Sequence, residues 1–474
     1  MGDPAARISA DDPPGATAIT SPTTASERDA TWKQVLALLS LSLSLLLWTN
    51  GLLDSLQRPS VSPALDRRQL ELAVLAAPAL EGSVGSAVVG SDPQERLLEA
   101  LLDDPASLQS GRERVLLELL ARRTGRSLPP SLPELPSGDP GPAGALARAL
   151  SDPTPDAASL PDGSGAEDPL LARLSCQVLG AAAPEDCVAA GEARAAAVKL
   201  AMVSVLPLLL LLGGLGLIAR LAWCRWRRSL PPEPPLRGPD LTLVDVTLLI
   251  AGGFVVLGET VVPLLALPLA QAVTTALGLE PPRSEALGVV LLYSSLMALP
   301  LMILALMLRG RPPIEGGLLQ WRWRPLGSGL RLAGGGVLMV LPLVSLAGWL
   351  AQRWFGEGGG SNPLLEVVLG SRDGLSLFCL AFTATVLAPW FEELLFRGVL
   401  LPVLVRRQSR LLGLVGSALV FAAAHLSLGE LLPLLVLGFA LGWLRLSSGR
   451  LAPCVLMHAL WNGFTFANLI VLGG

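Results

Sequence analysis

Long apolar runs constrain the fold of this chain more than any other feature. Hydrophobic residues make up 51% of the sequence and charged residues only 16%, against about 25% charged residues in a typical soluble domain. Roughly 20 apolar residues in a helix cross the hydrocarbon core of a bilayer, and strand-period alternation is absent. The sequence therefore predicts an all-α fold, a polytopic helical membrane protein with about nine transmembrane helices. The candidate spans lie near residues 34–53, 200–222, 242–269, 286–308, 330–351, 375–404, 411–426, 430–446 and 451–472.

The same patterning divides the chain into segments. Residues 34–53 form too long an apolar run for a signal-peptide core and lack a clear cleavage site, so we expect a membrane anchor. The hydrophilic part that follows carries short amphipathic patterns broken by Pro-, Gly- and Ser-rich stretches, which predicts a helical insert. The expected order is a disordered cytoplasmic N-terminus (1–33), the transmembrane anchor (34–53), an extracytoplasmic hydrophilic helical insert (54–197), a transmembrane helix (198–223), a basic linker (224–241) and a membrane core (242–474).

Arginine clusters after the even-numbered spans set the expected orientation. They lie at residues 220–228, 309–324, 406–410 and 445–450. Because Lys and Arg accumulate in cytoplasmic loops, we expect the N-terminus in the cytoplasm and the insert outside it. Cys176 and Cys187 of the insert then lie where a disulfide can form, and two unpaired thiols are the alternative. The default location for such an integral, multi-pass protein is the plasma (inner) membrane, with a thylakoid membrane as the alternative.

Ionisable residues gather in the last apolar runs. The chain has only two histidines, His425 and His458, and both lie in strongly apolar stretches. The apolar run before them carries Glu392, Glu393 and Arg397. Ionisable groups at membrane depth are costly and indicate function by default. A Glu–Arg pair or a buried histidine often serves packing alone, but the whole set indicates a catalytic site inside the bilayer.

The spacing of these residues assigns them different tasks. Glu393 and Arg397 are four residues apart, so on a helix they meet on one face as an ion pair. Glu392 points about 100° away from Glu393 and is left as the candidate general base. His425 follows on the next apolar run, where we expect it to hold a water molecule together with Glu392.

Two further pairs share a helix face. Phe421 precedes His425 by four residues, and His458 precedes Asn462 by four. His458 and Asn462 can both donate hydrogen bonds, which suits an oxyanion hole for a tetrahedral intermediate. A base, a water-binding imidazole and oxyanion donors together predict hydrolysis of a peptide bond, which we expect near the cytoplasmic side of the bundle.

Three short motifs in this order resemble the CPBP family of intramembrane glutamic endopeptidases, also called the CAAX prenyl protease, abortive-infection or lysostaphin resistance protein A-like family. They are Glu392-Glu393-x-x-x-Arg397, Phe421-x-x-x-His425 and His458-x-x-x-Asn462. The match is firm over residues 375–472, and the resemblance implies that the membrane core at 242–474 is a protease core of the CPBP type.

The resemblance also implies roles for the motif residues. The implied catalytic residues are Glu392, His425, His458 and Asn462, with Glu393, Arg397 and Phe421 in supporting roles. Glu392 would be the base and His425 its water-activating partner. The implied substrates are membrane proteins or lipidated, prenylated-type peptides in the lipid bilayer, without a cofactor. Zinc is disfavoured because no His-Glu-x-x-His motif is present, although two histidines and Glu392 are also a zinc ligand set.

Two other classes of function are consistent with the sequence. A membrane scaffold or chaperone of the same family would tolerate Glu392→Gln, whereas a protease would not. A proton-coupled transporter would use Glu259 and Glu392 as relay groups. Asp245 and Glu259 lie about four helical turns apart on roughly one face. They either line a substrate cavity or a proton path, or Asp245 lies at the membrane interface and Glu259 pairs inside the bundle. Nucleic-acid binding is not expected, because no basic tract with interleaved aromatic residues occurs.

Overall fold

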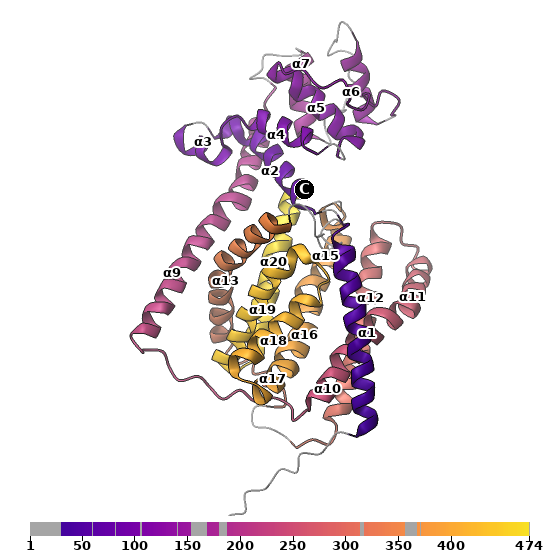
Figure 1. Ribbon diagram of the computed structural model, residues 1–474. Helices are drawn as coiled ribbons and strands as arrows, with labels where there is room; N and C mark the ends of the chain where they lie inside the picture. Colours follow the sequence, from indigo (N-terminus) through magenta and orange to yellow (C-terminus); the bar gives the residue numbers. More distant parts are fainter. Residues whose placement is uncertain are drawn as a thin grey trace, which may run out of the picture.

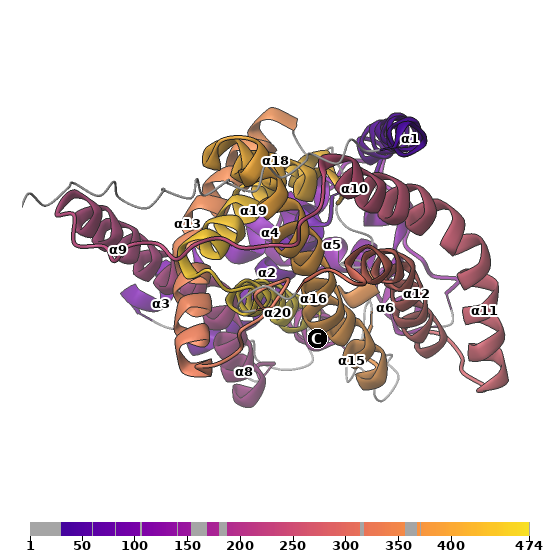
Figure 2. The ribbon, with the colours of Figure 1, turned by 90° about the horizontal axis from the view of Figure 1, so that it is seen from below.

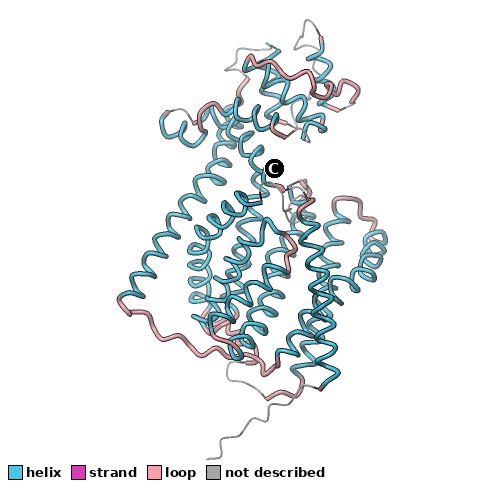
Figure 3. Tube along the Cα trace, in the orientation of Figure 1, coloured by secondary structure: helices cyan, strands magenta, loops and turns pink. Residues whose placement is uncertain are grey.

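A computed structural model describes residues 30–473, except for residues 59, 81, 105–106, 140, 153–167, 180–186, 313–316, 356–366 and 370. Of the N-terminal segment predicted to be disordered, residues 1–29 lie outside the described residues. Figure 3 shows helices joined by loops, and the part of the chain that is described contains no strand. The predicted all-α fold is therefore confirmed.

Eight helical segments are long and apolar enough to cross a membrane. They are Thr31–Ser55, Ala190–Trp226, Leu243–Ala276, Arg283–Leu308, Leu326–Trp354, Gly374–Arg407, Leu428–Ser448 and Ala452–Gly473. The remaining predicted span, 411–426, is the short helix α18 (Arg410–Ala423). At 1.5 Å per residue it extends only about 20 Å, too little to cross the bilayer alone. The chain is an integral, multi-pass membrane protein, and about nine membrane helices is consistent with the structure.

Several of these segments combine α-helical and π-helical turns. In chain order they comprise α1 (Thr31–Ser55), α8 (Ala190–Leu200), η4 (Ala201–Val205), α9 (Leu206–Trp226), α10 (Leu243–Thr247), η5 (Leu248–Val261), α11 (Val262–Ala276), α12 (Arg283–Leu308), α13 (Leu326–Phe355), α15 (Gly374–Phe382), η6 (Thr383–Leu387), α16 (Ala388–Glu393), η7 (Leu394–Leu400), α17 (Leu401–Arg407), α19 (Leu428–Ser448) and α20 (Ala452–Gly473). Two π-helical segments, η6 and η7, flank α16. Because π-helical turns are frequent at functional sites, this position indicates a functional role for the two glutamates at the end of α16.

The hydrophilic insert sits beyond one end of the membrane bundle (Figure 1). Its helices are α2 (Ser62–Ala76), α3 (Ser83–Val89), α4 (Pro93–Leu102), α5 (Gly111–Thr124), α6 (Pro142–Ser151) and α7 (Pro169–Leu179). We call this end of the bundle, where α20 also finishes, the insert end. We call the opposite end, where the linker joins α9 to α10, the arginine end, because the arginines after α9, α12 and α17 gather there.

The insert has a hydrophobic core of its own, built largely from leucines of α4, α5, α6 and α7. Arg112 joins its helices by donating to Glu71 at 2.9 Å and to Asp168 at 2.6 Å. Burial lowers the pKa of Arg112, but the hydrogen bonds and charges of Glu71 and Asp168 outweigh this effect and raise the pKa above its usual value. A disulfide joins Cys176 to Cys187. Of the two possibilities that the sequence left open, the structure has the disulfide and not two unpaired thiols.

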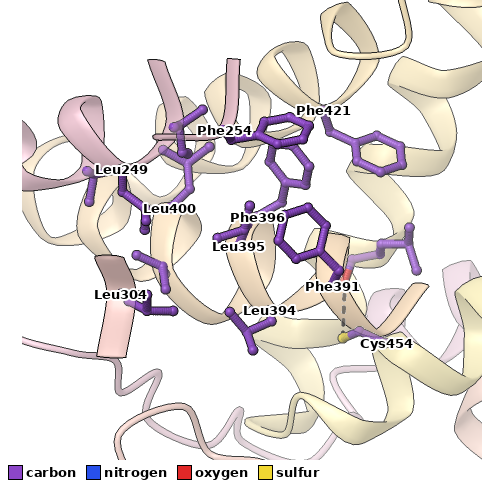
Figure 4. Packing of buried hydrophobic residues seen from close by; sticks show 14 of the residues in the cluster. Leu249, Phe254, Leu304, Phe391, Leu394, Leu395, Phe396, Leu400, Phe421 and Cys454 are labelled. Carbon is purple, nitrogen blue, oxygen red and sulfur yellow. Dashed lines mark hydrogen bonds between the residues drawn. The ribbon is translucent and has the colours of Figure 1, made fainter. Parts of the chain in front are cut away.

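Aromatic side chains hold the centre of the membrane bundle together. Phe254 of η5, Phe391 of α16, Phe396 of η7 and Phe421 of α18 are all buried. Figure 4 shows them gathered in one cluster, and their rings meet edge to face at centroid distances of 5.5–6.5 Å. Such contacts add specific geometry to the burial of apolar area. They bring the helix that carries the two glutamates against the helix that leads to His425.

Helix α1 runs along the outside of the bundle and docks on α10 and η5 (Figure 2). Lys33 pairs with Asp245 at 3.4 Å near the start of α1. Ser44 donates to a backbone carbonyl of η5 at 2.8 Å, and the indole of Trp48 donates to Glu259 at 3.4 Å. Asp245 and Glu259 therefore both contact α1, and Glu259 has a hydrogen-bond partner within the bundle.

Candidate active site

Glu392 and Glu393 lie at the end of α16 and engage different partners, as their neighbouring positions on a helix require. Glu393 Oε1 accepts from Arg397 Nη1 at 2.7 Å, and both side chains are fully buried. His458 Nδ1 lies 3.0 Å from the same oxygen. The predicted Glu393–Arg397 pair is therefore present in the structure, and it also holds the ring of His458 in place.

Arg397 is compensated from three sides. Its Nη2 donates to the carbonyl of Gly438 on α19 at 3.0 Å, and its guanidinium lies over the Phe421 ring at 4.2 Å from the centroid. A buried charge without partners would be very costly, and a cation over an aromatic face recovers part of that cost. Phe421 thus supports the site by covering Arg397, and its ring also contacts the rings of His425 and His458.

Glu392 faces a different group of side chains. Its Oε1 accepts from the Tyr293 hydroxyl of α12 at 3.1 Å. Its Oε2 is buried and has no hydrogen-bond partner. The Nε2 atoms of His425 and His458 each lie 3.9 Å from that oxygen. This distance is too long for a direct hydrogen bond and suits a single bridging water.

Hydrogen bonds at the other ring nitrogens define the two imidazoles. His425 Nδ1 lies 2.9 Å from the carbonyl oxygen of Phe421. A carbonyl only accepts, so Nδ1 carries a proton, and in a neutral imidazole Nε2 then presents a lone pair toward Glu392. His458 Nδ1 faces the Glu393 carboxylate in the same way. With Nδ1 bonded to Glu393, His458 can donate from Nε2 only when both ring nitrogens carry a proton.

His425 is carried by a turn and not by a regular helix. Helix α18 ends at Ala423, and the chain turns through His425 before α19 begins at Leu428. Leu426 has a positive φ of 51°, which is uncommon for a residue with a side chain. Although His425 lies beyond the end of α18, its ring still contacts Phe421, because the ring lies against the last turn of that helix.

Asn462 lies one turn beyond His458 on α20. Its Nδ2 donates to the Ala384 carbonyl at 2.8 Å, which uses one of two amide hydrogens and ties α20 to η6. Both His458 and Asn462 line the cavity described next. The structure therefore brings Glu392, His425, His458 and Asn462 to one cavity, as their sequence spacing led us to expect.

A cavity of about 350 Å³ has the catalytic candidates at its floor. In the segment Gly374–Arg407, no residue after Glu392 lines the cavity. In α20, no residue before His458 lines it. On α19 all of the lining residues lie in the first half of the helix. In each helix this is the half toward the insert end. The remaining walls are mostly apolar, and the lining residues are Tyr293, Val368, Leu380, Thr383, Ala384, Ala388, Glu392, His425, Glu430, Pro433, Leu434, Leu437, His458, Trp461, Asn462, Thr465, Phe466 and Leu469.

The side of the floor toward the arginine end is packed. Trp321 stacks on Trp390 with ring centroids 6.2 Å apart. Arg445 is fully buried and donates to Gln320 at 2.8 Å and to the Arg237 carbonyl at 3.0 Å. The sequence placed Arg445 in a cytoplasmic arginine cluster, whereas in the structure it ties α19 to the linker. The cavity accordingly extends from Glu392 toward the insert end, and hydrolysis near the cytoplasmic side stays a prediction.

Sequence reasoning did not identify Tyr293 as a site residue. It is the only tyrosine of the chain, and it lies in the middle of an apolar run. A single polar aromatic residue inside a membrane span was the available signal, because a buried phenol needs a hydrogen-bond partner. Its partner, Glu392, lies 99 positions along the chain, and spacing within one helix cannot reveal such a contact.

A comparison with protein families agrees with this geometry. The family model of type II CAAX prenyl endopeptidases, Rce1-like, matches residues 374–464. These residues form an Rce1-like domain. The match contains all three motifs and confirms the resemblance to the CPBP family of membrane endopeptidases. A second family model, described only as a domain of unknown function (DUF8675), matches residues 62–198. No curated protein and no solved structure matches the chain.

Glu392, His425 and His458 are the candidate metal ligands of the Rce1-like domain, and the distances between their ligand atoms can be compared with those of a zinc site. Both imidazole Nε2 atoms lie 3.9 Å from Glu392 Oε2. Ligand atoms of a tetrahedral zinc with bonds of about 2 Å lie only about 3.3 Å apart. In the described part of the chain, no group of three or more His, Cys, Asp or Glu side chains is arranged to hold a metal ion. The spacing at Glu392 suits a water molecule better than zinc.

Proposed function

We propose that the Rce1-like domain hydrolyses peptide bonds inside the membrane, with Glu392 as the general base. The observation that carries this proposal is the buried, unpartnered Glu392 Oε2 with His425 Nε2 3.9 Å away. A water molecule between them donates one hydrogen to Glu392 and the other to the lone pair of His425. Two acceptors then fix its orientation, and its oxygen lone pairs point into the cavity.

Each group has a task in the proposed reaction. The water oxygen attacks the scissile carbonyl carbon while Glu392 takes its proton. The carbonyl oxygen becomes an oxyanion that accepts from the Nε2–H of His458 and the free amide hydrogen of Asn462. Glu392 then delivers the proton to the amide nitrogen, and the carbon–nitrogen bond breaks. The products are a carboxylic acid and an amine, and the acid then ionises by giving its proton to the amine or to solvent.

The proposed step needs a proton on both ring nitrogens of His458. Its Nδ1 faces the Glu393 carboxylate at 3.0 Å, so the hydrogen bond to the oxyanion comes from Nε2. The carboxylates of Glu392 and Glu393 both lie within 4 Å of the ring and would balance its positive charge.

The direction of the cavity supports entry of the substrate from the insert end. Its walls toward that end are built from apolar residues such as Leu380, Phe466 and Leu469. Leu65 of α2 packs against this group. Such walls suit an apolar membrane segment or a lipidated peptide. With the N-terminus in the cytoplasm and a plasma membrane as the location, the entrance would face the extracytoplasmic side.

The contacts of Glu259 argue against a proton-coupled transporter. Its carboxylate accepts from Trp48 of α1 and is not among the residues that line the cavity with Glu392. A relay would need these two acids to share one path. We favour the endopeptidase because Glu392, His425, His458 and Asn462 all line one cavity.

Purified protein incubated with a farnesylated CAAX-type peptide and with a bilayer-spanning peptide tests the proposal. Product masses identify any cleaved bond. We expect His425→Ala and His458→Ala to lower kcat by roughly 10²- to 10⁴-fold. Asn468→Ala is the matched control, because Asn468 of α20 bonds only within its own helix and should leave cleavage unchanged. Activity lost on zinc chelation would contradict the water mechanism, and no cleavage by wild type would favour the scaffold.

A further inference from the structure

We infer that the end of α1 positions the catalytic turn, and that Arg58 and Ser55 are positioning residues for His425. The inference rests on the proposed function and extends the machinery beyond the Rce1-like domain at residues 374–464. The two residues lie more than 300 positions before the turn in the sequence. The contacts that join them to it are polar, and they involve the Leu426 carbonyl and the Leu428 amide.

The turn between α18 and α19 is restrained by its own hydrogen bonds only in part. The amides of His425 and Leu426 donate back to α18, whereas the Leu426 carbonyl and the Leu428 amide are bonded by α1. Between them Leu426 adopts a positive φ of 51°. A leucine in this conformation persists only where its surroundings hold it. The His425 ring needs a defined backbone, because its Nε2 must stay 3.9 Å from Glu392 Oε2 to share a water.

The end of α1 supplies further hydrogen bonds that hold the backbone of the turn. Arg58 Nη2 donates to the Leu426 carbonyl at 2.5 Å. The Ser55 hydroxyl accepts from the Leu428 amide at 3.2 Å and donates to its own helix at 2.6 Å. Ser55 is fully buried. The backbone is thus held immediately after His425 and again two residues later.

Close packing at Gly51 reinforces these hydrogen bonds. A Cβ at position 51 would lie 3.1 Å from the Leu426 side chain, which is tighter than an ordinary contact. The glycine therefore lets α1 approach the turn closely. Leu426 is thus enclosed by α1, Arg58 and Ser55. These contacts hold it in its positive-φ conformation.

Helix α1 can act as a rigid support because it is anchored elsewhere along its length. Lys33, Ser44 and Trp48 make polar contacts to α10 and η5 at three levels. A site held by a fixed helix is more accurately placed than a site held by a loop. Losing the contact to the turn should therefore disturb His425 without releasing α1 from the bundle.

Kinetics of full-length variants test the inference. Misplacement of a catalytic group by about 1 Å costs on the order of 100-fold in rate. We expect Arg58→Ala to lower kcat roughly 10- to 100-fold with little change in KM. Arg58→Lys keeps a donor and should restore most of the rate. Ser44→Ala is the matched control, because it removes a hydrogen bond of α1 far from the turn.

A cysteine pair tests the contact without relying on activity. In a background without Cys224, Cys379 and Cys454, Gly51→Cys and Leu426→Cys should crosslink rapidly on mild oxidation. The control pair is Gly51→Cys with Leu411→Cys, because position 411 lies in the first turn of α18 at the arginine end. Failure of the first pair to crosslink would contradict the contact even if the protein cleaves no peptide.

The kinetic outcomes separate the two proposals. Loss of cleavage in the catalytic variants together with equal rates for Arg58→Ala and Ser44→Ala would overturn the positioning role and leave the endopeptidase intact. An increase in KM alone for Arg58→Ala would also overturn it. An inactive wild type with an efficient 51–426 crosslink would contradict the endopeptidase while confirming that α1 holds the turn.

Discussion

His458 and Glu393 form a buried hydrogen bond of 3.0 Å between two membrane helices. Glu393 also bonds Arg397 at 2.7 Å, so one carboxylate oxygen serves both an ion pair and an imidazole. The second glutamate of the motif is therefore more than a structural partner of the arginine. It holds Nδ1 of His458 and leaves Nε2 facing Glu392 and the cavity.

The Tyr293 hydroxyl should contribute to catalysis through Glu392. Tyr293→Phe removes the bond to Glu392 Oε1, and a hydrogen bond to a charged group is worth about 1.5–3 kcal/mol. We expect kcat/KM to fall roughly 10- to 150-fold without loss of thermal stability. Ser295→Ala on the same helix is the control, because Ser295 bonds only to its own helix. An unchanged kcat/KM for Tyr293→Phe would contradict this role.

The buried pair of Glu393 and Arg397 should matter for stability as well as activity. Arg397→Met leaves Glu393 buried without its main partner, which typically costs about 3–5 kcal/mol. Adding Glu393→Gln should recover part of the loss, because the unpaired charge is removed. Denaturant unfolding in detergent measures both. Arg126→Met, at the exposed Arg126–Glu99 pair, should change stability little, and equal losses in the two positions would contradict the account.

Substrate access should depend on the half of the cavity toward the insert end. Thr465 lines the cavity one turn beyond Asn462. Thr465→Phe should therefore raise KM or abolish cleavage of a membrane-spanning peptide. Leu460→Phe is the control, because Leu460 is 44% exposed on the same helix and does not line this cavity. Normal cleavage by the Thr465 variant would show that substrate arrives by another route.

The orientation of the chain can be read from its own cysteines. With the insert outside, Cys176→Ser leaves Cys187 free on the extracytoplasmic side. A membrane-impermeant maleimide should label this variant in intact cells. Cys224, near the arginine end of α9, should react only after permeabilisation. The reverse pattern would contradict the orientation inferred from arginine clusters.

The Asp373–Arg283 pair should give a pH dependence of stability at the insert end. Hydrogen bonds from Arg283 and Ser376 lower the pKa of Asp373 to about 2. A carboxyl with a lowered pKa stabilises the fold above its unfolded pKa and loses that effect as the pH falls through about 2. Asp373→Asn should therefore lower the melting temperature at pH 5 and make less difference near pH 2. A constant difference across this range would contradict the assignment.

Much of the fold follows from hydrophobic patterning, because the bilayer demands helices of defined length. The segments near 34–53, 286–308 and 451–472 appear as full spans. Local spacing also anticipated the Glu393–Arg397 pair and the shared face of His458 and Asn462, since contacts four residues apart are properties of a single helix.

Contacts between distant segments could not be anticipated in the same way. Tyr293 reaches Glu392 across two spans, Arg58 reaches Leu426 across most of the chain, and Arg445 turns inward to Gln320. Each depends on how the helices pack, which periodicity does not encode. The direction of the cavity belongs to the same class, because it emerges only when the lining of several helices is compared.

The rate of cleavage by Glu392→Gln, relative to Glu259→Gln, tests the central claim most directly. Both changes replace a carboxylate at membrane depth with an amide of nearly equal size, and Glu259 lies outside the cavity. Single-turnover cleavage of the same peptide in liposomes should fall by at least roughly 100-fold for Glu392→Gln and remain near wild type for Glu259→Gln. Equal rates for the two variants would show that Glu392 is not the base.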